Sequence, residues 1–98
     1  MKAKIWNKKA WISATDERYL TAEFLQALRD AGFNVLSSAA ARFEPYGFTI
    51  VFLLAESHFA IHTFPESGKS YIELSSCNKK KHDKFIDICL RRGLIQAF

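Results

Sequence analysis

Apolar residues recur along the chain with two different spacings, and each spacing predicts a different kind of element. In residues 18–31 they return every three or four positions, which is the period of a helix with one buried face. Residues 82–92 repeat this pattern more briefly. Gly32 and Gly93 follow the two segments, and glycine at that place commonly ends a helix. The sequence therefore predicts two helices.

Shorter apolar segments surround the two helices and are typical of strands bounded by turns. About six strands are expected, at residues 4–14, 33–43, 47–54, 58–64, 69–77 and 94–98. Turns are expected at 44–47 and 65–68, because proline presets one backbone dihedral there and glycine tolerates a positive φ. The strands between residues 47 and 77 should form an antiparallel meander.

These elements predict the α+β class. Two helices and a mostly antiparallel sheet can bury their apolar surfaces as a two-layer α/β sandwich, with both helices on one face of the sheet. The chain has 98 residues, of which 49% are hydrophobic, and this is enough for one core. We therefore expect residues 1–98 to form a single domain.

Side chains alternate between the two faces of a strand, so the sequence also predicts which residues lie together. In the last two strands of the meander, Phe59, Ile61, Ile72 and Leu74 should face the helices. The titratable side chains should face away, namely His58, His62, Tyr71, Glu73 and Cys77. The polar chemistry of the chain is therefore expected on one sheet face.

Antiparallel counting around the 65–70 turn places residue 64 beside 71 and residue 58 beside 77. Cys77 then returns next to the Glu56–Ser57–His58 turn, and Glu73 lies near His62. A thiol, an imidazole, a hydroxyl and a carboxylate on one patch can supply the acid, the base and the nucleophile of a reaction. His82 and Cys89, on the second helix, have no such neighbours and are interpreted as structural.

Charge and composition exclude several other classes. The net charge is +4, but the lysines at 79–81 are interpreted as a solvated basic loop, with RNA binding as a minor alternative. The longest apolar run is far below the roughly 20 residues that cross a bilayer, and no leader-like segment follows Met1, so a cytoplasmic protein is expected. Cys77 and Cys89 should be thiols there, and no metal-ligand spacing is present.

One part of the chain resembles a known family. The segment ARFEPYGFTIVFLLAESHFAIHTFPE, followed by IELSSC, resembles the short prokaryotic form of S-adenosylmethionine decarboxylase. In that family an E-S-H, an I-H-T-x-P-E and a later cysteine occur at this spacing. The resemblance extends from about Phe43 to Cys77, and the flanking helices and strands follow the family's order.

The resemblance implies a proenzyme that cuts its own chain between Glu56 and Ser57. In the family, the serine hydroxyl attacks the preceding carbonyl, an ester replaces the amide, and elimination with loss of ammonia leaves a pyruvoyl group. Residue 57 thus becomes the cofactor. His62 is similar to the family's processing histidine, and Thr49 occupies the place of a hydroxyl residue that supports it. An offset hairpin should place Thr49 and His62 opposite each other.

The resemblance also implies the later reaction. The pyruvoyl ketone would form a Schiff base with the α-amine of S-adenosylmethionine and accept the electrons released with carbon dioxide. Cys77 matches the residue that returns a proton to the α-carbon. Phe43 and Phe64 match positions that flank the adenine, and Glu66 matches a carboxylate for the ribose. A homodimer is expected from the family's habit and from an apolar open sheet face.

Several positions depart from the family pattern and leave alternatives open. Phe64 stands where tryptophan is commoner, Glu73 where aspartate is usual, Asn78 where glycine follows the cysteine, and the first strand lacks a histidine. A second reading keeps the pyruvoyl chemistry with ornithine or arginine as substrate. A third is an uncleaved homologue that serves as a partner or regulatory subunit.

The spacing of the proposed processing residues sets one condition on the fold. Along a straight strand Ser57 and His62 would lie about 16 Å apart, which is too far for proton transfer. Residues 55–58 are therefore expected to fold back over the sheet.

Overall fold

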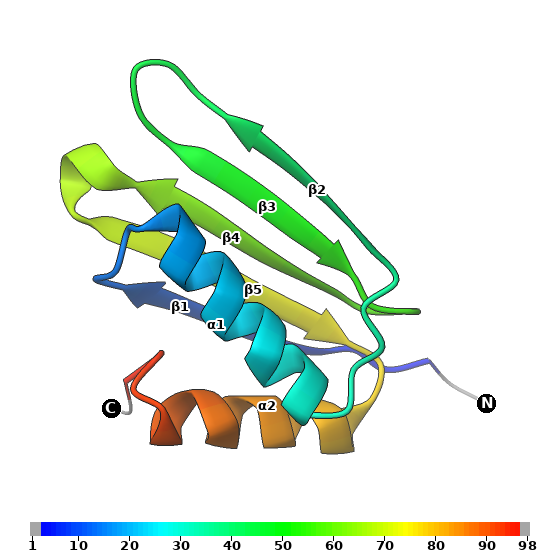
Figure 1. The fold of residues 1–98 in the computed structure, drawn as a ribbon. Coiled ribbons are helices and arrows are strands. Elements are labelled where there is room, and N and C mark those ends of the chain that lie inside the picture. The colour runs from blue at the N-terminus through cyan, green and yellow to red at the C-terminus, as the bar shows by residue number, and fades with distance from the viewer. Residues whose placement is uncertain (1–2, 97–98) are drawn as a thin grey trace.

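The chain folds into two layers, a sheet and a pair of helices that cover one of its faces (Figure 1). The computed structural model describes residues 3–96. The helices are α1 (Glu17–Asp30) and α2 (Lys79–Arg91), and the strands are β1 (Trp6–Ile12), β2 (Ser37–Arg42), β3 (Phe48–Leu53), β4 (His58–Phe64) and β5 (Lys69–Ser76). The strand order is β1-β5-β4-β3-β2, with every neighbouring pair antiparallel. The predicted α+β sandwich is confirmed.

Helix α1 lies within one residue of its predicted bounds because both of its ends are specified locally. The side chain of Asp16 accepts a hydrogen bond from the backbone nitrogen of Tyr19 and caps the first turn. At the other end, Gly32 adopts a φ of +96°, and Phe33 N donates to Leu28 O at 3.0 Å. This left-handed termination turns the buried Phe33 back onto the core.

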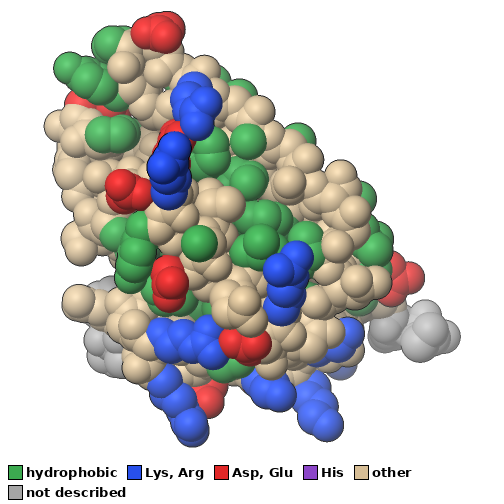
Figure 2. Space-filling model, in the orientation of Figure 1, with side chains coloured by type: hydrophobic (Ala, Val, Ile, Leu, Met, Phe, Trp, Pro, Cys, Tyr) green, Lys and Arg blue, Asp and Glu red, His purple; other side chains and the backbone are tan. Residues whose placement is uncertain are grey.

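Helix α2 begins three residues earlier than predicted. The side chain of Asn78 accepts a hydrogen bond from Lys81 N at 3.0 Å, so Lys79, Lys80 and Lys81 form the first helical turn. The interpretation of these lysines as a basic loop was therefore wrong. Figure 2 shows basic side chains gathered over this helix.

The predicted closing strand is also wrong for residues 94–96, and residues 97 and 98 lie outside the described part of the chain. Gly93 has a φ of +70°, and Leu94 N donates to Cys89 O at 2.9 Å. The apolar pair that suggested a strand, Leu94 and Ile95, instead folds back and is buried against the core after α2. The helix end thus uses hydrophobic residues that sequence pattern alone assigns to a sheet.

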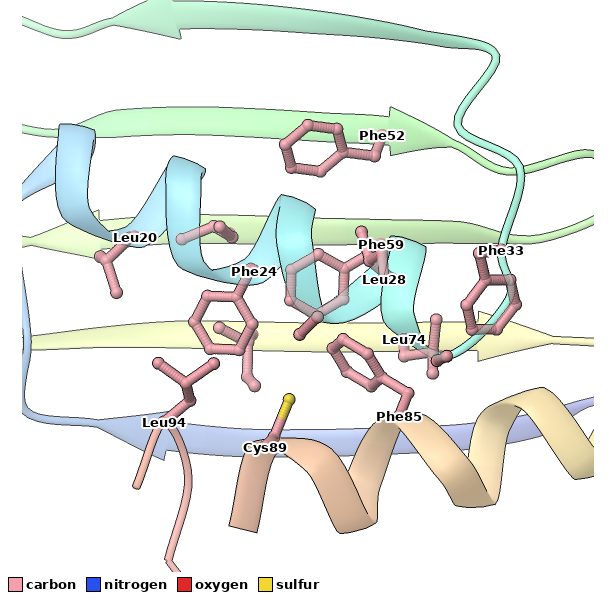
Figure 3. Packing of buried hydrophobic residues seen from close by; sticks show 14 of the residues in the cluster. Leu20, Phe24, Leu28, Phe33, Phe52, Phe59, Leu74, Phe85, Cys89 and Leu94 are labelled. Atoms are coloured by element: carbon pink, nitrogen blue, oxygen red, sulfur yellow. The ribbon is translucent and has the colours of Figure 1, made fainter. Parts of the chain in front are cut away.

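The core lies between the helices and the sheet, and three aromatic rings form its centre (Figure 3). Phe24 of α1, Phe59 of β4 and Phe85 of α2 have ring centroids 5.1 to 6.3 Å apart. Burying a phenylalanine of this kind stabilises a fold by about 2 kcal/mol. Cys89 points into the same cluster, where burial raises the pKa of its thiol to about 12, so it is a packing residue as expected.

The hairpin of β4 and β5 has a register two residues away from the predicted one. His58 pairs with Ser75 and Phe64 pairs with Lys69. A short 3-10 turn at Pro65–Ser67, closed by Gly68 with a φ of +66°, connects the strands directly. The prediction failed because it left more residues unpaired in the turn than this conformation needs.

The second face of the sheet is not covered by any element of residues 3–96. The helix-facing side chains alternate with those of this open face, as predicted for Phe59, Ile61, Ile72 and Leu74. Neither helix is long and apolar enough to span a membrane.

Candidate active site

The turn between β3 and β4 carries an unusual backbone conformation. Ala55 and Glu56 both adopt positive φ, at 39° and 63°, and Leu54 N donates to Ser57 O at 2.9 Å. A two-residue hairpin turn of this kind normally uses Asn-Gly, because side chains disfavour the left-handed region. Such residues cost of order 1 kcal/mol each and cluster at functional sites. The strained segment ends at the Glu56–Ser57 peptide bond.

Both residues of that peptide bond reach across to the end of β5. The Ser57 hydroxyl is buried and donates a hydrogen bond to Ser76 Oγ at 3.1 Å. The Cys77 thiol donates to Glu56 Oε2 at 3.5 Å. The structure therefore brings together Glu56, Ser57 and Cys77, as predicted, although the strand register differs.

His62 does not join this group. It lies on the open face of β4, where its Nδ1 is 2.9 Å from Thr49 Oγ1 in the directly paired position of β3. The predicted Thr49–His62 pair is thus present. Ser57, in contrast, is buried beside Ser76 on the helix side of the sheet. Residues 55–58 form a tight turn and do not fold back toward His62, so the expected approach within one chain does not occur.

A chain of side-chain contacts extends from His62 across the open face. The His62 ring stacks on Tyr71 with centroids 6.2 Å apart, and the Tyr71 hydroxyl donates to Glu73 Oε1 at 2.9 Å. Asn7 of β1 donates to Glu73 Oε2 at 3.1 Å. Glu73 therefore lies near His62 through Tyr71, and not in direct contact.

These contacts shift the pKa values of Glu73 and Tyr71. The hydrogen bond from Asn7, followed by that from Tyr71, holds the pKa of Glu73 below its ordinary value. Burial, with the Glu73 carboxylate as a second cause, raises the pKa of Tyr71. Glu73 is therefore a fixed carboxylate and Tyr71 a neutral donor near pH 7. Among residues 3–96, no group of three His, Cys, Asp or Glu side chains could hold a metal ion.

The residues predicted to contact substrate lie at the opposite end of the sheet. Phe43 follows β2, Phe64 ends β4 and Glu66 lies in the 3-10 turn, and all three are exposed. Strand β4, of seven residues, separates this end from Ser57 by about 20 Å. One chain thus carries two separate groups of predicted site residues, which we call the cutting end (Glu56, Ser57 and Cys77) and the aromatic end (Phe43, Phe64 and Glu66).

Sequence reasoning missed three residues that the structure places in these groups. Ser76 contacts Ser57, Asn7 holds Glu73, and Trp11 packs on Phe64 and Tyr71 with centroids 5.8 and 5.2 Å apart. Ser76 had a usable signal, because it is a hydroxyl at a helix-facing position that follows Ile72 and Leu74. Asn7 and Trp11 had none, because the pairing of β1 with β5 joins residues 58 to 70 positions apart.

Comparison with known proteins identifies the family of this fold and site. A family model for S-adenosylmethionine decarboxylase matches residues 10–92. The chain is 39% identical over 64 residues to an S-adenosylmethionine decarboxylase proenzyme of Brevibacillus brevis, covering 65% of this chain and 48% of that protein. It is 42% identical over 62 residues to the proenzyme of Prochlorococcus marinus, covering 63% and 50%.

A solved structure agrees at the level of the fold. The adenosylmethionine decarboxylase of Aquifex aeolicus superposes with a TM-score of 0.76 at 24% identity, covering 99% of this chain and 86% of that one. The chain spans about half the length of the curated relatives it matches. Since the family model covers most of the residues, the chain belongs to the S-adenosylmethionine decarboxylase family.

Proposed function

We propose that this chain is a self-processing, pyruvoyl-dependent decarboxylase that acts on S-adenosylmethionine. The observation that supports this most directly is the turn at residues 54–57. A serine hydroxyl is held directly after two strained residues, the second of which contacts the Cys77 thiol, in a family whose relatives are named proenzymes. Residues 1–98 would form one decarboxylase domain, and a cytoplasmic location remains a prediction.

Processing would begin at the hydroxyl of Ser57. Its attack on the Glu56 carbonyl would convert the amide that follows two residues of positive φ into an ester. Removal of the Ser57 α-proton then requires a base, for which we propose His62. The Thr49 hydroxyl, 2.9 Å from His62 Nδ1, would fix the orientation of the ring.

The product of processing would be a pyruvoyl group at residue 57, which supplies an electrophilic ketone able to accept the electrons released by decarboxylation. Cys77 would deliver a proton there, a role that its contact with the Glu56 carboxylate supports. Glu56 can both accept this thiol hydrogen bond and hold it in place after the chain is cut.

We further propose that the active form is a homodimer whose sites are shared between two copies. The cutting end and the aromatic end of one chain are about 20 Å apart, and His62 lies about 16 Å along the strand from Ser57. A second sheet stacked in the antiparallel direction on the open face would bring the aromatic end of one copy to the cutting end of the other. Trp11, Leu53 and Phe64 expose 55%, 52% and 39% of their surface on this face, which favours such a partner.

Substrate recognition would then fall to the aromatic end. Phe43 and Phe64 offer flat apolar surfaces that can flank an adenine, and the Glu66 carboxylate can accept hydrogen bonds from ribose hydroxyls. A substrate without a nucleoside, such as ornithine or arginine, would leave these two aromatic residues unused. This contrast favours S-adenosylmethionine over the basic amino acids.

Mass spectrometry of the purified protein tests the proposal. We expect one fragment that ends at Glu56 and another that begins with a pyruvoyl group, and a Ser57→Ala chain should stay intact and inactive. A Cys77→Ala chain should still be cut but should decarboxylate at least about 100-fold more slowly, because a positioned proton donor contributes that much.

The same material separates the alternatives. Product analysis after incubation with S-adenosylmethionine, ornithine and arginine identifies the substrate. A wild-type chain that remains full length, with no carbonyl that hydrazine can trap, would show instead an uncleaved partner or regulatory subunit.

A further inference from the structure

The buried hydroxyl groups of Ser57 and Ser76 connect the turn at residues 54–57 to the start of helix α2. Ser76 is completely buried, and its Oγ accepts hydrogen bonds from Ser57 Oγ at 3.1 Å and from Asn78 N at 3.0 Å. The same Oγ donates to Asn78 O at 3.3 Å. A hydroxyl placed among core residues is costly unless it is bonded, and here every bonding position of Ser76 is in use.

The direction of the Ser57–Ser76 hydrogen bond follows from this count. A serine hydroxyl can donate one hydrogen bond, and Ser76 donates its hydrogen bond to the carbonyl oxygen of Asn78. Ser76 can therefore only accept from Ser57. The backbone of Asn78, which also caps α2 through its side chain, thus determines where the proton of Ser57 points.

We propose that Ser76 is a positioning residue for self-cleavage, an inference that rests on the proposed function. In the first step the bond between Ser57 Oγ and the Glu56 carbonyl carbon forms, and the bond from that carbon to the Ser57 nitrogen breaks. The proton leaves Oγ and ends on the nitrogen, so the step is an isomerisation without another reactant. By accepting a hydrogen bond from the Ser57 hydroxyl before the reaction, Ser76 keeps the lone pairs of Ser57 Oγ free for the carbonyl and restricts the side chain to one rotamer.

Two substitutions of equal shape isolate the hydroxyl of Ser76. Ser76→Thr adds a methyl group and keeps the hydroxyl, whereas Ser76→Val adds the same methyl group and replaces the hydroxyl with a second one, so only threonine retains the acceptor. We expect the valine chain to be cut about 10- to 100-fold more slowly than the threonine chain, which is the size of effect that lost positioning produces. Time courses of cleavage in freshly refolded chains, read by intact mass, measure the ratio.

Ser70→Ala provides the control for a purely structural effect. Ser70 is also completely buried on the helix side of β5, and its hydroxyl donates to Ala14 O at 2.7 Å, at the far end of the strand from Ser57. It should lower the thermal stability and leave the cleavage rate unchanged. Equal cleavage of the valine and threonine chains, or slowing by Ser70→Ala to the same extent, would overturn the role of Ser76.

Hydroxylamine shows which step is affected, because it cleaves esters and leaves amides intact. If Ser76 acts in ester formation, no ester accumulates in the valine chain, and hydroxylamine will not accelerate the release of fragments. If hydroxylamine restores rapid release, Ser76 acts in a later step and the inference is wrong. A wild-type chain that is never cut would remove the proposed function itself and this role with it. If the wild-type chain is cut and both Ser76 variants are cut at the wild-type rate, the role of Ser76 is wrong and the proposed function stands.

Discussion

The Glu73 carboxylate accepts hydrogen bonds from Asn7 of the neighbouring strand β1 and from Tyr71 of its own strand β5, and this makes part of the stability depend on pH. Asn7 and Tyr71 lower the pKa of Glu73 in the folded chain relative to its unfolded value. Their stabilising contribution is therefore present above the unfolded pKa, near pH 4.3, and is lost as the pH falls through the lower folded pKa.

We expect Asn7→Ala to reduce the free energy of unfolding at pH 7 and to reduce it less at pH 3. The pH-dependent part should be at most about 1 kcal/mol, because the pair is accessible to solvent. The hydrogen bond of Asn7 to Ser75, at 2.7 Å, contributes at both pH values. Urea unfolding of an uncut Ser57→Ala chain measures the difference.

Glu73→Gln provides the matched background for this measurement. In a chain that carries Glu73→Gln, Asn7→Ala should lower the free energy of unfolding by the same amount at pH 7 and at pH 3. If Asn7→Ala also lowers the free energy of unfolding equally at both pH values when Glu73 is present, the hydrogen bond from Asn7 to Glu73 is contradicted.

At the scale of elements, helix α2 begins with three lysines and has no acidic residue in its first turn. The positive end of the helix dipole repels these charges. Lys80→Glu should therefore raise the free energy of unfolding by about 0.5 kcal/mol, through the dipole and through a new pairing with Lys84 one turn later.

Lys84→Glu is the control, because it makes the same charge change farther from the helix start; it pairs with Lys80 in the reverse order and also removes the attraction between Lys84 and Asp30. It should stabilise the chain less, since the influence of the dipole falls off within the first turn. Chemical denaturation of both chains decides the matter. Equal gains would mean that pairing alone is responsible.

The elements that the sequence predicted well are those whose signals are local. Helix α1 has a regular apolar face together with Asp16 and Gly32 at its ends, and each of these acts within a few residues. Helix α2 was predicted too short because its first turn depends on the cap by Asn78 and shows no apolar period. The register of β4 and β5 depended on a turn conformation that Pro65 and Gly68 permit but do not determine.

The candidate site was predictable only in part for the same reason. Alternation along the strands placed Thr49 beside His62, and the returning strand placed Cys77 beside Glu56. The separation of Ser57 from His62 by the thickness of the sheet follows from their odd spacing along the strand, whereas the tight turn that replaces the expected fold-back was not predictable, because it needs positive φ values at Ala55 and Glu56. Neither residue type favours that conformation.

At the scale of the whole molecule, the divided site gives a test of the proposed dimer. A Cys77→Ala chain and a His62→Ala chain should each be inactive alone. In a mixed dimer, one site receives Cys77 from one copy and His62 from the other, so co-expression should restore up to about a quarter of wild-type activity if the two copies mix at random.

Sedimentation of the wild-type chain at micromolar concentration provides the accompanying control, and should show two copies. If the mixed dimer shows no decarboxylase activity, Cys77 and His62 of a working site belong to the same copy. A monomeric wild type would remove the proposed shared site altogether.

The strand order also determines what a cut after Glu56 would do to the particle. Strands β4 and β5 would belong to the piece from residue 57 onward, whereas their outer neighbours, β3 and β1, would belong to the piece before it. The later piece is inserted between two strands of the earlier one, through seven paired positions with β1 and six with β3. Two polypeptides would then remain interlocked as one body, because neither can leave without opening a ladder on both sides of the inserted hairpin.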